Sequence, residues 1–283
     1  MMSQESGVLF VVAAPIGNLE DVTRRAERIL SEVDLIACED TRRTRTLLSH
    51  LGIKKPLQSY YEPREQERTP QLVELLKQGK NVALVTDGGT PGISDPGYRL
   101  VRTAWQEGLS VIPVPGPSAM AAALSAAGLP TDRVSFIGFV PRKKQARRRE
   151  LEGLSARPDT LVFYESPKRL EAFLSDALEV LGDREAVIFR EISKAFEERL
   201  GDKLSVLLEE VRRRELKGEV TVLIGGKEEA EAISEEELKG IITERLQQGL
   251  SVKDTASEVA AGTGWSKKEV YRLAVEIKQE RGP

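Results

Sequence analysis

Short apolar runs alternate with amphipathic stretches through the first 118 residues. Runs rich in Val, Ile and Leu predict strands, and apolar residues spaced three or four positions apart predict helices. The predicted strands cover residues 8–14, 33–38, 81–86 and 109–114, and the predicted helices cover 19–30, 42–51, 70–79 and 97–108. This alternation favours an α/β domain with a mostly parallel sheet that helices cover on both faces.

The pattern changes at about residue 119, where a second α/β domain is predicted to extend to residue 226. Strand-like runs occupy 133–140, 160–166, 185–192 and 218–226, and helical patterns occupy 142–149, 168–182 and 202–215. The connections differ in length, which favours a mixed sheet. Two sheet domains in one chain predict an enzyme with a cleft between them.

Residues 227–283 form a third segment, an acidic linker followed by three amphipathic stretches at 238–249, 251–264 and 266–280. Ser251 and Ser266 stand where helix N-caps are expected. The three stretches predict a small helical domain, and their spacing is typical of a helix-turn-helix.

Each predicted strand of the first domain ends in a loop of turn residues, and parallel sheets bind ligands at this edge. The loops lack the G-x-x-x-x-G-K-[ST] and G-x-G-x-x-G patterns of nucleotide sites. Their glycines let the main chain approach a ligand closely: Gly17, Gly88, Gly89, Gly92 and Gly116. One such loop is explained as a simple turn, but four together predict a small-molecule cofactor that binds to main-chain groups.

The composition is that of a folded, soluble protein, with 40% hydrophobic and 31% charged residues among 283. No run approaches the roughly 20 apolar residues that cross a membrane, and the start lacks the pattern of a signal peptide, so a cytoplasmic location is expected. Cys38 and His50 are the single cysteine and histidine. They exclude an internal disulfide and a Cys/His metal site.

The charge is segregated along the chain although its net value is only −3. Residues 142–149 hold six cations in eight positions, and residues 227–237 are acidic. A basic run of this kind is either a solvated helix face or a contact for a polyanion.

Six motifs occur in a characteristic order: "APIGNLEDVTRRA", "ACEDTRRT", "TDGGTPGISDPG", "VPGPSA", "FYESPKRL" and "GEVTVLIGG". From about Val8 to Gly226 the chain resembles the tetrapyrrole methylase superfamily, and within it the ribosomal RNA small subunit methyltransferase I family. The third segment resembles the helix-turn-helix domain of many members. One departure is Gly88, where the family more often has Ala. This change is expected to preserve the role of the main chain.

The resemblance implies S-adenosylmethionine bound between the two sheet domains and transfer of its methyl group to the ribose 2′-oxygen of a cytidine in the decoding region of 16S ribosomal RNA. It also suggests a homodimer. Matched by motif, the cofactor residues are Pro15, Gly17, Asp87, Gly88, Gly89, Thr90, Pro91, Ser118, Ala119, Tyr164, Glu219 and Thr221.

A ribose hydroxyl is a poor nucleophile, so a general base is expected near it. The carboxylates at predicted strand ends are Asp40, Asp87, Asp95 and Glu165. Our hypothesis assigns the base to Asp87 or Glu165. Asp95 precedes a proline and is interpreted as a helix N-cap, and His50 as the end of a helix.

Two basic clusters are candidates for RNA contacts. They comprise Arg42, Arg43 and Arg45 in the first domain and Arg142, Lys143, Lys144, Arg147, Arg148 and Arg149 in the second. Lys267, Lys268 and Arg272 in the third segment are further candidates, and a helical cap for assembly or stability is the alternative there. Tyr60, Tyr61 and Tyr164 are considered for stacking on an extruded base.

Three other functions compete with RNA methylation. The same fold is used to methylate a corrin or porphyrin carbon, but that chemistry calls for neither a six-cation helix nor a terminal helix-turn-helix. The remaining two are a nucleic-acid-binding regulator and a structural factor of ribosome assembly. The predicted substrate is therefore 16S ribosomal RNA or the small subunit.

Overall fold

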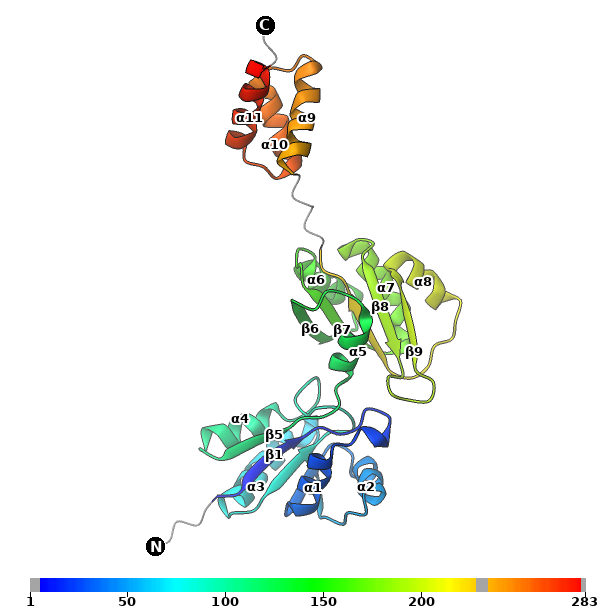
Figure 1. Ribbon diagram of the computed structural model, residues 1–283. Coiled ribbons are helices and arrows are strands. Elements are labelled where there is room, and N and C mark those ends of the chain that lie inside the picture. The colour runs from blue at the N-terminus through cyan, green and yellow to red at the C-terminus, as the bar shows by residue number, and fades with distance from the viewer. Residues whose placement is uncertain (1–5, 228–233, 281–283) are drawn as a thin grey trace. The chain divides into compact units, whose positions relative to one another are not determined.

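The structure, a computed structural model, describes residues 6–227 and 234–280, which belong to two compact units (Figure 1). The first unit contains two five-stranded sheets, and the second is helical. The division expected at residue 118 falls within the first unit, between the two sheets. The predicted acidic linker includes residues 228–233, which lie outside the described residues.

The first sheet is fully parallel, with the strand order β3-β2-β4-β1-β5. Its strands are β1 (Val8–Val12), β2 (Leu35–Cys38), β3 (Leu57–Ser59), β4 (Val82–Val85) and β5 (Ser110–Val114). Because the strands are parallel, the loops that follow them meet at one edge. The pattern did not predict β3, since its three residues include polar Gln58 and Ser59.

Helices cover both faces of this sheet, as predicted. On one face lie α1 (Arg24–Glu32) and α2 (Thr41–His50), and on the other lie α3 (Glu65–Lys77) and α4 (Tyr98–Gln106). Short 3-10 helices cover Leu19–Asp21 and Glu62–Arg64. The apolar stripes of α1 and α3 pack against opposite sides of β4. Both layers therefore hold the strand that leads into the Gly-rich loop.

The second sheet is mixed, as predicted, with the order β6-β7-β10-β8-β9. Its strands are β6 (Val134–Phe139), β7 (Thr160–Glu165), β8 (Glu185–Arg190), β9 (Glu198–Lys203) and β10 (Val220–Ile224). Among these strands, only β6 and β7 pair in parallel. The sequence pattern missed β9, because this edge strand is largely exposed and polar.

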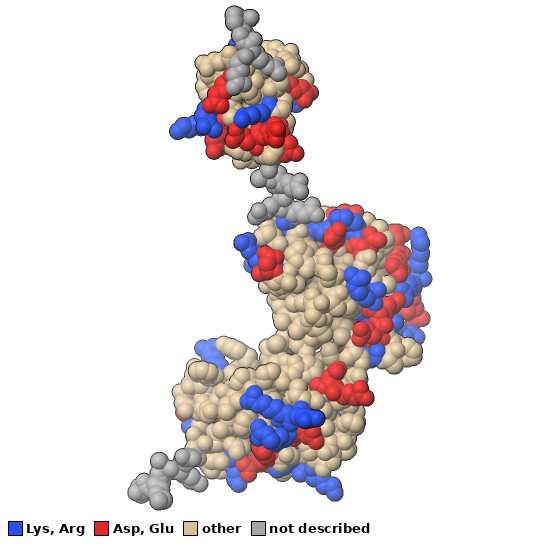
Figure 2. All heavy atoms as spheres, viewed as in Figure 1, with Lys and Arg blue, Asp and Glu red and all other residues tan. Residues whose placement is uncertain are grey.

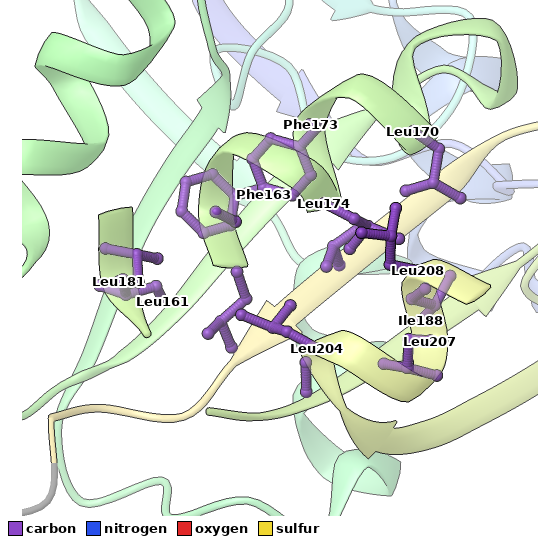
Figure 3. Packing of buried hydrophobic residues seen from close by; sticks show 14 of the residues in the cluster. Leu161, Phe163, Leu170, Phe173, Leu174, Leu181, Ile188, Leu204, Leu207 and Leu208 are labelled. Carbon is purple, nitrogen blue, oxygen red and sulfur yellow. The ribbon is translucent and has the colours of Figure 1, made fainter. Parts of the chain in front are cut away.

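Four helices pack on the second sheet. One face carries α6 (Lys144–Leu154), α7 (Pro167–Leu181) and α8 (Leu204–Arg212), and the other carries α5 (Ala119–Ala127). Figure 3 shows Phe163 of β7 beside Phe173 of α7, with ring centroids 5.0 Å apart. Leucines of α7 and α8 complete this core.

The second unit is the three-helix domain that the sequence predicted, with α9 (Glu235–Gln247), α10 (Val252–Thr263) and α11 (Lys267–Glu280). Both predicted N-caps are confirmed. The Ser251 hydroxyl accepts from the Asp254 N–H, and the Ser266 hydroxyl accepts from the Glu269 N–H.

Within residues 6–227 and 234–280, no helix is both long and apolar enough to span a bilayer. The same residues contain no group of three or more His, Cys, Asp or Glu side chains that is arranged to hold a metal ion.

Candidate active site

A cavity of 510 Å³ lies at the carboxyl edge of the first sheet and is also lined by residues of the second. The residues predicted for the cofactor line it, except Pro91, which is buried. The other lining residues are Ile16, Leu19, Glu39, Arg43, Ile93, Ser94, Asp95, Phe139, Glu165, Ile192, Lys194 and Val220. Loops that are far apart in the sequence thus enclose one space.

The Gly-rich loop after β4 is fixed to the end of β1. The Ala14 N–H donates to the Gly89 carbonyl at 2.8 Å, and the Gly89 N–H donates to the Ala14 carbonyl at 2.9 Å. Gly89 has a φ of +80°, a conformation that favours glycine. We expected both Gly88 and Gly89 to offer free main-chain groups to a ligand. In the structure, Gly89 instead uses both groups to place the loop.

Asp87 joins the loops that follow β2 and β4. Its carboxylate accepts from the Asp40 N–H at 3.0 Å and lies 3.5 Å from Nε of Arg43. Its own N–H donates to Glu39 at 3.3 Å. Asp40 caps α2 by accepting from the Arg42 N–H. These contacts explain Asp40 as a cap and place Asp87 on the cavity wall.

Asp95 is not the helix cap that its position before Pro96 suggested. The N-cap of α4 is Gly97, with no side-chain cap bond, and Asp95 lines the cavity. Burial raises the pKa of Asp95 to about 7, and repulsion from the Glu39 and Asp87 carboxylates adds to this rise. A carboxyl group with this pKa exchanges protons near neutral pH.

Tyr164 of β7 connects the second sheet to the start of α5. Its hydroxyl accepts from the Met120 N–H at 3.2 Å, and its ring meets those of Phe136 and Phe139 edge-on. Burial raises the pKa of the phenol. Tyr164 therefore faces the cavity as a neutral, hydrogen-bonded ring.

Glu165, one of the two predicted proton acceptors, is held in an ion pair. Its carboxylate lies 2.7 Å from Arg169 and accepts from the Ser166 N–H at 2.8 Å. Arg169 also donates to the Val140 carbonyl. Burial raises the pKa of Glu165, but its side chain is already committed to these partners. The geometry favours a structural role for Glu165.

Sequence reasoning missed Lys194, a residue of the second domain that lines the cavity. Its Nζ donates to Glu191 at 2.9 Å and to Glu219 at 3.1 Å. Burial disfavours the charged amine, but the two carboxylates outweigh it and raise its pKa. A Cβ on Gly17 would lie 2.3 Å from Cγ of Lys194. Glycine at position 17 thus permits close contact with the Lys194 side chain. The sequence around Lys194 did not predict this contact.

The basic run at 142–149 is divided by the fold. Arg147 is only 5% exposed, and its guanidinium binds Asp176 of α7 at 2.6 Å. It cannot reach RNA from this position, which corrects our prediction for Arg147. Arg148 pairs with Glu179. In the described part of the chain, no ion pair involves the exposed cations Arg142, Lys143, Lys144 and Arg149.

The other basic cluster and the tyrosines also separate. Arg43 reaches the cavity, whereas Arg42 pairs with its neighbour Asp40 and Arg45 is exposed. Tyr60 is fully buried, and its hydroxyl hydrogen-bonds with Thr69, so it cannot stack on a base. His50 is the last residue of α2, as expected.

Comparison with known proteins identifies the family. Residues 8–208 match the family model described as Tetrapyrrole (Corrin/Porphyrin) Methylases, and residues 234–278 match the RsmI C-terminal HTH domain. The chain is 43% identical over 95% of both lengths to Ribosomal RNA small subunit methyltransferase I of Halalkalibacterium halodurans and, equally, of Escherichia coli O157:H7. The chain belongs to the ribosomal RNA small subunit methyltransferase I family of the tetrapyrrole methylases.

A family relative from Thermotoga maritima is 48% identical over 222 residues, which are 78% of this chain and the whole of that relative. A match of this extent is nearly as long as the α/β unit.

Solved structures share the fold of the α/β unit. Uroporphyrin-III C-methyl transferase of Thermus thermophilus, complexed with S-adenyl homocysteine, has a TM-score of 0.54 at 24% identity and covers 78% of this chain and 97% of that one. Diphthine synthase has a TM-score of 0.60 at 16% identity, covering 78% and 90%. At these identities the likeness shows the fold alone.

Proposed function

We propose that this chain transfers a methyl group from S-adenosylmethionine to the ribose 2′-oxygen of a cytidine in the decoding region of 16S ribosomal RNA. One observation carries the proposal. A cavity of 510 Å³ lies at the ligand-binding edge of a sheet, in a chain 43% identical over 95% of its length to a ribosomal RNA small subunit methyltransferase.

The donor set of the cavity fits this cofactor. S-adenosylmethionine supplies a methyl group on a positively charged sulfur, and it also carries an ammonium group. The lining includes five carboxylates, Glu39, Asp87, Asp95, Glu165 and Glu219, against the cations Arg43 and Lys194. This excess of negative charge favours a cationic ligand. The volume is also in the range of sites for small organic ligands.

Three parts of the cavity wall would contribute to holding the cofactor. Ser118 and Ala119 at the start of α5 bring the N-terminal end of a helix to the cavity, where a carboxylate is favoured. The loop after β4 contributes Gly88 and Thr90. Tyr164 of β7 would contribute its aromatic ring.

The RNA is proposed to reach the cavity along the start of α6. β6 and β7 are parallel, so the loop before α6 leaves the same edge of the second sheet as Tyr164. Lys143 caps α6 without a side-chain cap bond, and Lys144 begins the helix. Cations and free N–H groups at a helix N-terminus suit a phosphate.

Cations near α8 and β9 differ from those at the start of α6, because they form ion pairs with carboxylates. On the face shown in Figure 2, cations near α8 and β9 alternate with carboxylates, and Arg212 and Arg214 each form ion pairs there. By contrast, the exposed residues at 142–144 and 149 lack such partners among the described residues. We therefore assign the phosphate contacts in the second domain to Arg142, Lys143, Lys144 and Arg149. A cytoplasmic location, expected from the sequence pattern, and a homodimer, which the resemblance suggests, are part of the same proposal.

The test is transfer of labelled methyl from S-adenosylmethionine to small subunits that lack their decoding-region methylations. Mass mapping then locates the label. Label on the ribose of one cytidine is the expected result. Label on a base, or no label on RNA while the protein binds S-adenosylhomocysteine, would overturn the proposal. The second result would reopen methylation of a tetrapyrrole carbon.

A further inference from the structure

The segment that contains Asp95 is fixed on both sides of this residue. Ser94 has a φ of +64°, which residues other than glycine adopt rarely. A Cβ on Gly138 of β6 would lie only 2.7 Å from the Ser94 hydroxyl oxygen. Glycine at position 138 therefore leaves space for the Ser94 side chain. On the other side, the Gly97 N–H donates to Glu65 at 2.8 Å. The backbone thus directs Asp95 at the cavity, and strain of this kind is typical of functional sites.

The carboxylates of the cavity differ in their partners. Asp87 lies beside Arg43, Glu165 beside Arg169 and Glu219 beside Lys194. Within the part of the chain that the structure describes, Asp95 forms no ion pair. Glu39 also lacks a cation there, but it accepts the Asp87 N–H. A hydrogen bond with Thr86 lowers the pKa of Asp95, but burial outweighs it. Since Asp95 binds neither a cation nor a main-chain N–H among the described residues, it is the lining carboxylate that remains to take a proton from a substrate.

This inference rests on the proposed function. We propose that Asp95 is the catalytic base, which accepts the proton of the ribose 2′-hydroxyl. The oxygen–hydrogen bond breaks as the oxygen forms its bond to the methyl carbon, and the electron pair of the carbon–sulfur bond remains on sulfur. The carboxylate becomes a neutral carboxylic acid, and the positive sulfur becomes a neutral thioether. Asp95 then returns its proton to water.

The charges that surround Asp95 support this role. The titratable and charged groups of the cavity come from both sheets: Glu39, Arg43, Asp87, Tyr164, Glu165, Lys194 and Glu219. Burial, followed by repulsion from Glu39 and Asp87, raises its pKa to about 7. A base acts in its deprotonated form, so activity should increase as the pH rises through about 7. A bound sulfonium would favour the carboxylate form of Asp95. The rise in activity would then occur at lower pH.

The decisive variant is Asp95→Asn, which keeps the size of the side chain but cannot accept the proton. We expect its single-turnover rate to fall by roughly 10²- to 10⁴-fold. Binding of S-adenosylhomocysteine, measured by calorimetry, should weaken by less than about threefold, well under the 1.4 kcal/mol of a tenfold change. Asp95→Glu should recover part of the rate. Asp132→Asn, at an exposed loop position, is the matched control and should leave both quantities unchanged.

A titration gives a readout that is independent of catalysis. Carbon-13 NMR of the side-chain carboxyls should show a group titrating near 7 in the wild type and in Asp132→Asn, and this signal should be absent from Asp95→Asn. The pH profile of the single-turnover rate should lose its rising limb in the same variant.

The outcomes separate the two proposals. If the wild type methylates the expected ribose but Asp95→Asn keeps its rate and its rising limb, Asp95 is not the base. The assignment would also be overturned if Glu39→Gln lost the rise of the single-turnover rate with pH while Asp95→Asn kept it. In that case Glu39 would be the base. If the wild type places no methyl group on RNA, the proposed function itself fails.

Discussion

The two sheets of the α/β unit contribute to the cavity in different ways. The first is parallel and supplies loops from the ends of β1, β2, β4 and β5, with glycines where backbones approach closely. The second is mixed and contributes charged and aromatic residues, including Tyr164, Lys194 and Glu219. A parallel sheet brings many loops to one edge, whereas antiparallel neighbours send alternate loops to opposite edges.

This difference has a consequence for mutation. Contacts of the first domain depend on main-chain geometry and on the lack of a Cβ, so small substitutions should disturb them. Contacts of the second domain depend on ion pairs, so removal of one partner should disturb them most. The following changes test each side of the comparison.

The largest effect is expected at the buried ion pair of the second domain. Arg147→Ala leaves the Asp176 carboxylate, which is 2% exposed, without its partner. We expect a loss of roughly 3–5 kcal/mol in stability. Hydrogen exchange of the β7 and α7 amides measures it locally. Arg148→Ala, which removes a cation paired at the surface, should cost less than about 1 kcal/mol. Equal losses in the two variants would contradict the assignment of Arg147 to the core.

The next effect concerns the exposed cations. Replacement of Arg142, Lys143, Lys144 and Arg149 by Ala should weaken RNA binding and flatten its salt dependence. The slope should fall by about 0.7 for each phosphate of a single strand that these cations no longer neutralise. Filter binding over a range of salt concentrations measures this slope. Arg212→Ala with Arg214→Ala is the control, because both cations are paired. An unchanged slope in the fourfold variant would remove this cluster from the RNA site.

A smaller effect separates two glycines of the first domain. Gly17→Ala forces the Lys194 side chain away and should cost about 1–3 kcal/mol in stability. At Gly88 a Cβ would lie 3.3 Å from the nearest atom, the Pro15 carbonyl oxygen, so Gly88→Ala should change stability by less than about 1 kcal/mol. Gly17→Ala should also weaken the binding of S-adenosylhomocysteine more than Gly88→Ala does. A greater loss in Gly88→Ala would argue against the Lys194 contact.

The smallest effect lies at the start of α8, whose Ser205 N–H donates to Asp183 at 2.8 Å. The N-cap of α8 is Lys203, which forms no side-chain cap bond, so Asp183 is a distant acceptor for this end of the helix. Asp183→Ala should cost about 1 kcal/mol, as for a lost hydrogen bond. The hydrogen bonds to Ser205 lower the pKa of Asp183. Its contribution is therefore complete above the ordinary aspartate pKa and disappears as the pH falls through the lowered value. Thermal unfolding of wild type and variant should converge in acid. A difference that persists in acid would argue against a stabilising contact between the Asp183 carboxylate and Ser205.

Much of the fold and of the cavity could be predicted from sequence. Most of the strands, the loops after β1, β2, β4 and β5, and the caps at Ser251 and Ser266 follow from local patterns. The cofactor residues were predicted from the resemblance of their motifs to the family, and all except Pro91 line one cavity. Their roles in binding remain predictions.

Other features could not be predicted because they depend on distant partners. Asp95 looked like a cap from the following proline, but the cavity and its neighbouring carboxylates determine its pKa. Lys194 lies beside Gly17, and nothing in either local sequence indicates that contact. The short strand β3 and the polar edge strand β9 lacked an apolar pattern.

The sequence by itself determined the alternation of strands and helices, the positions of the turns and the resemblance that predicts the reaction. These features arise from residues close together in the chain, since hydrophobic periodicity, capping and glycine conformations are local. The tertiary structure alone decided which of six neighbouring cations is buried and which carboxylates of the cavity are paired. Burial and Coulomb interactions depend on distance in space, and Arg147 meets Asp176 from 29 residues away.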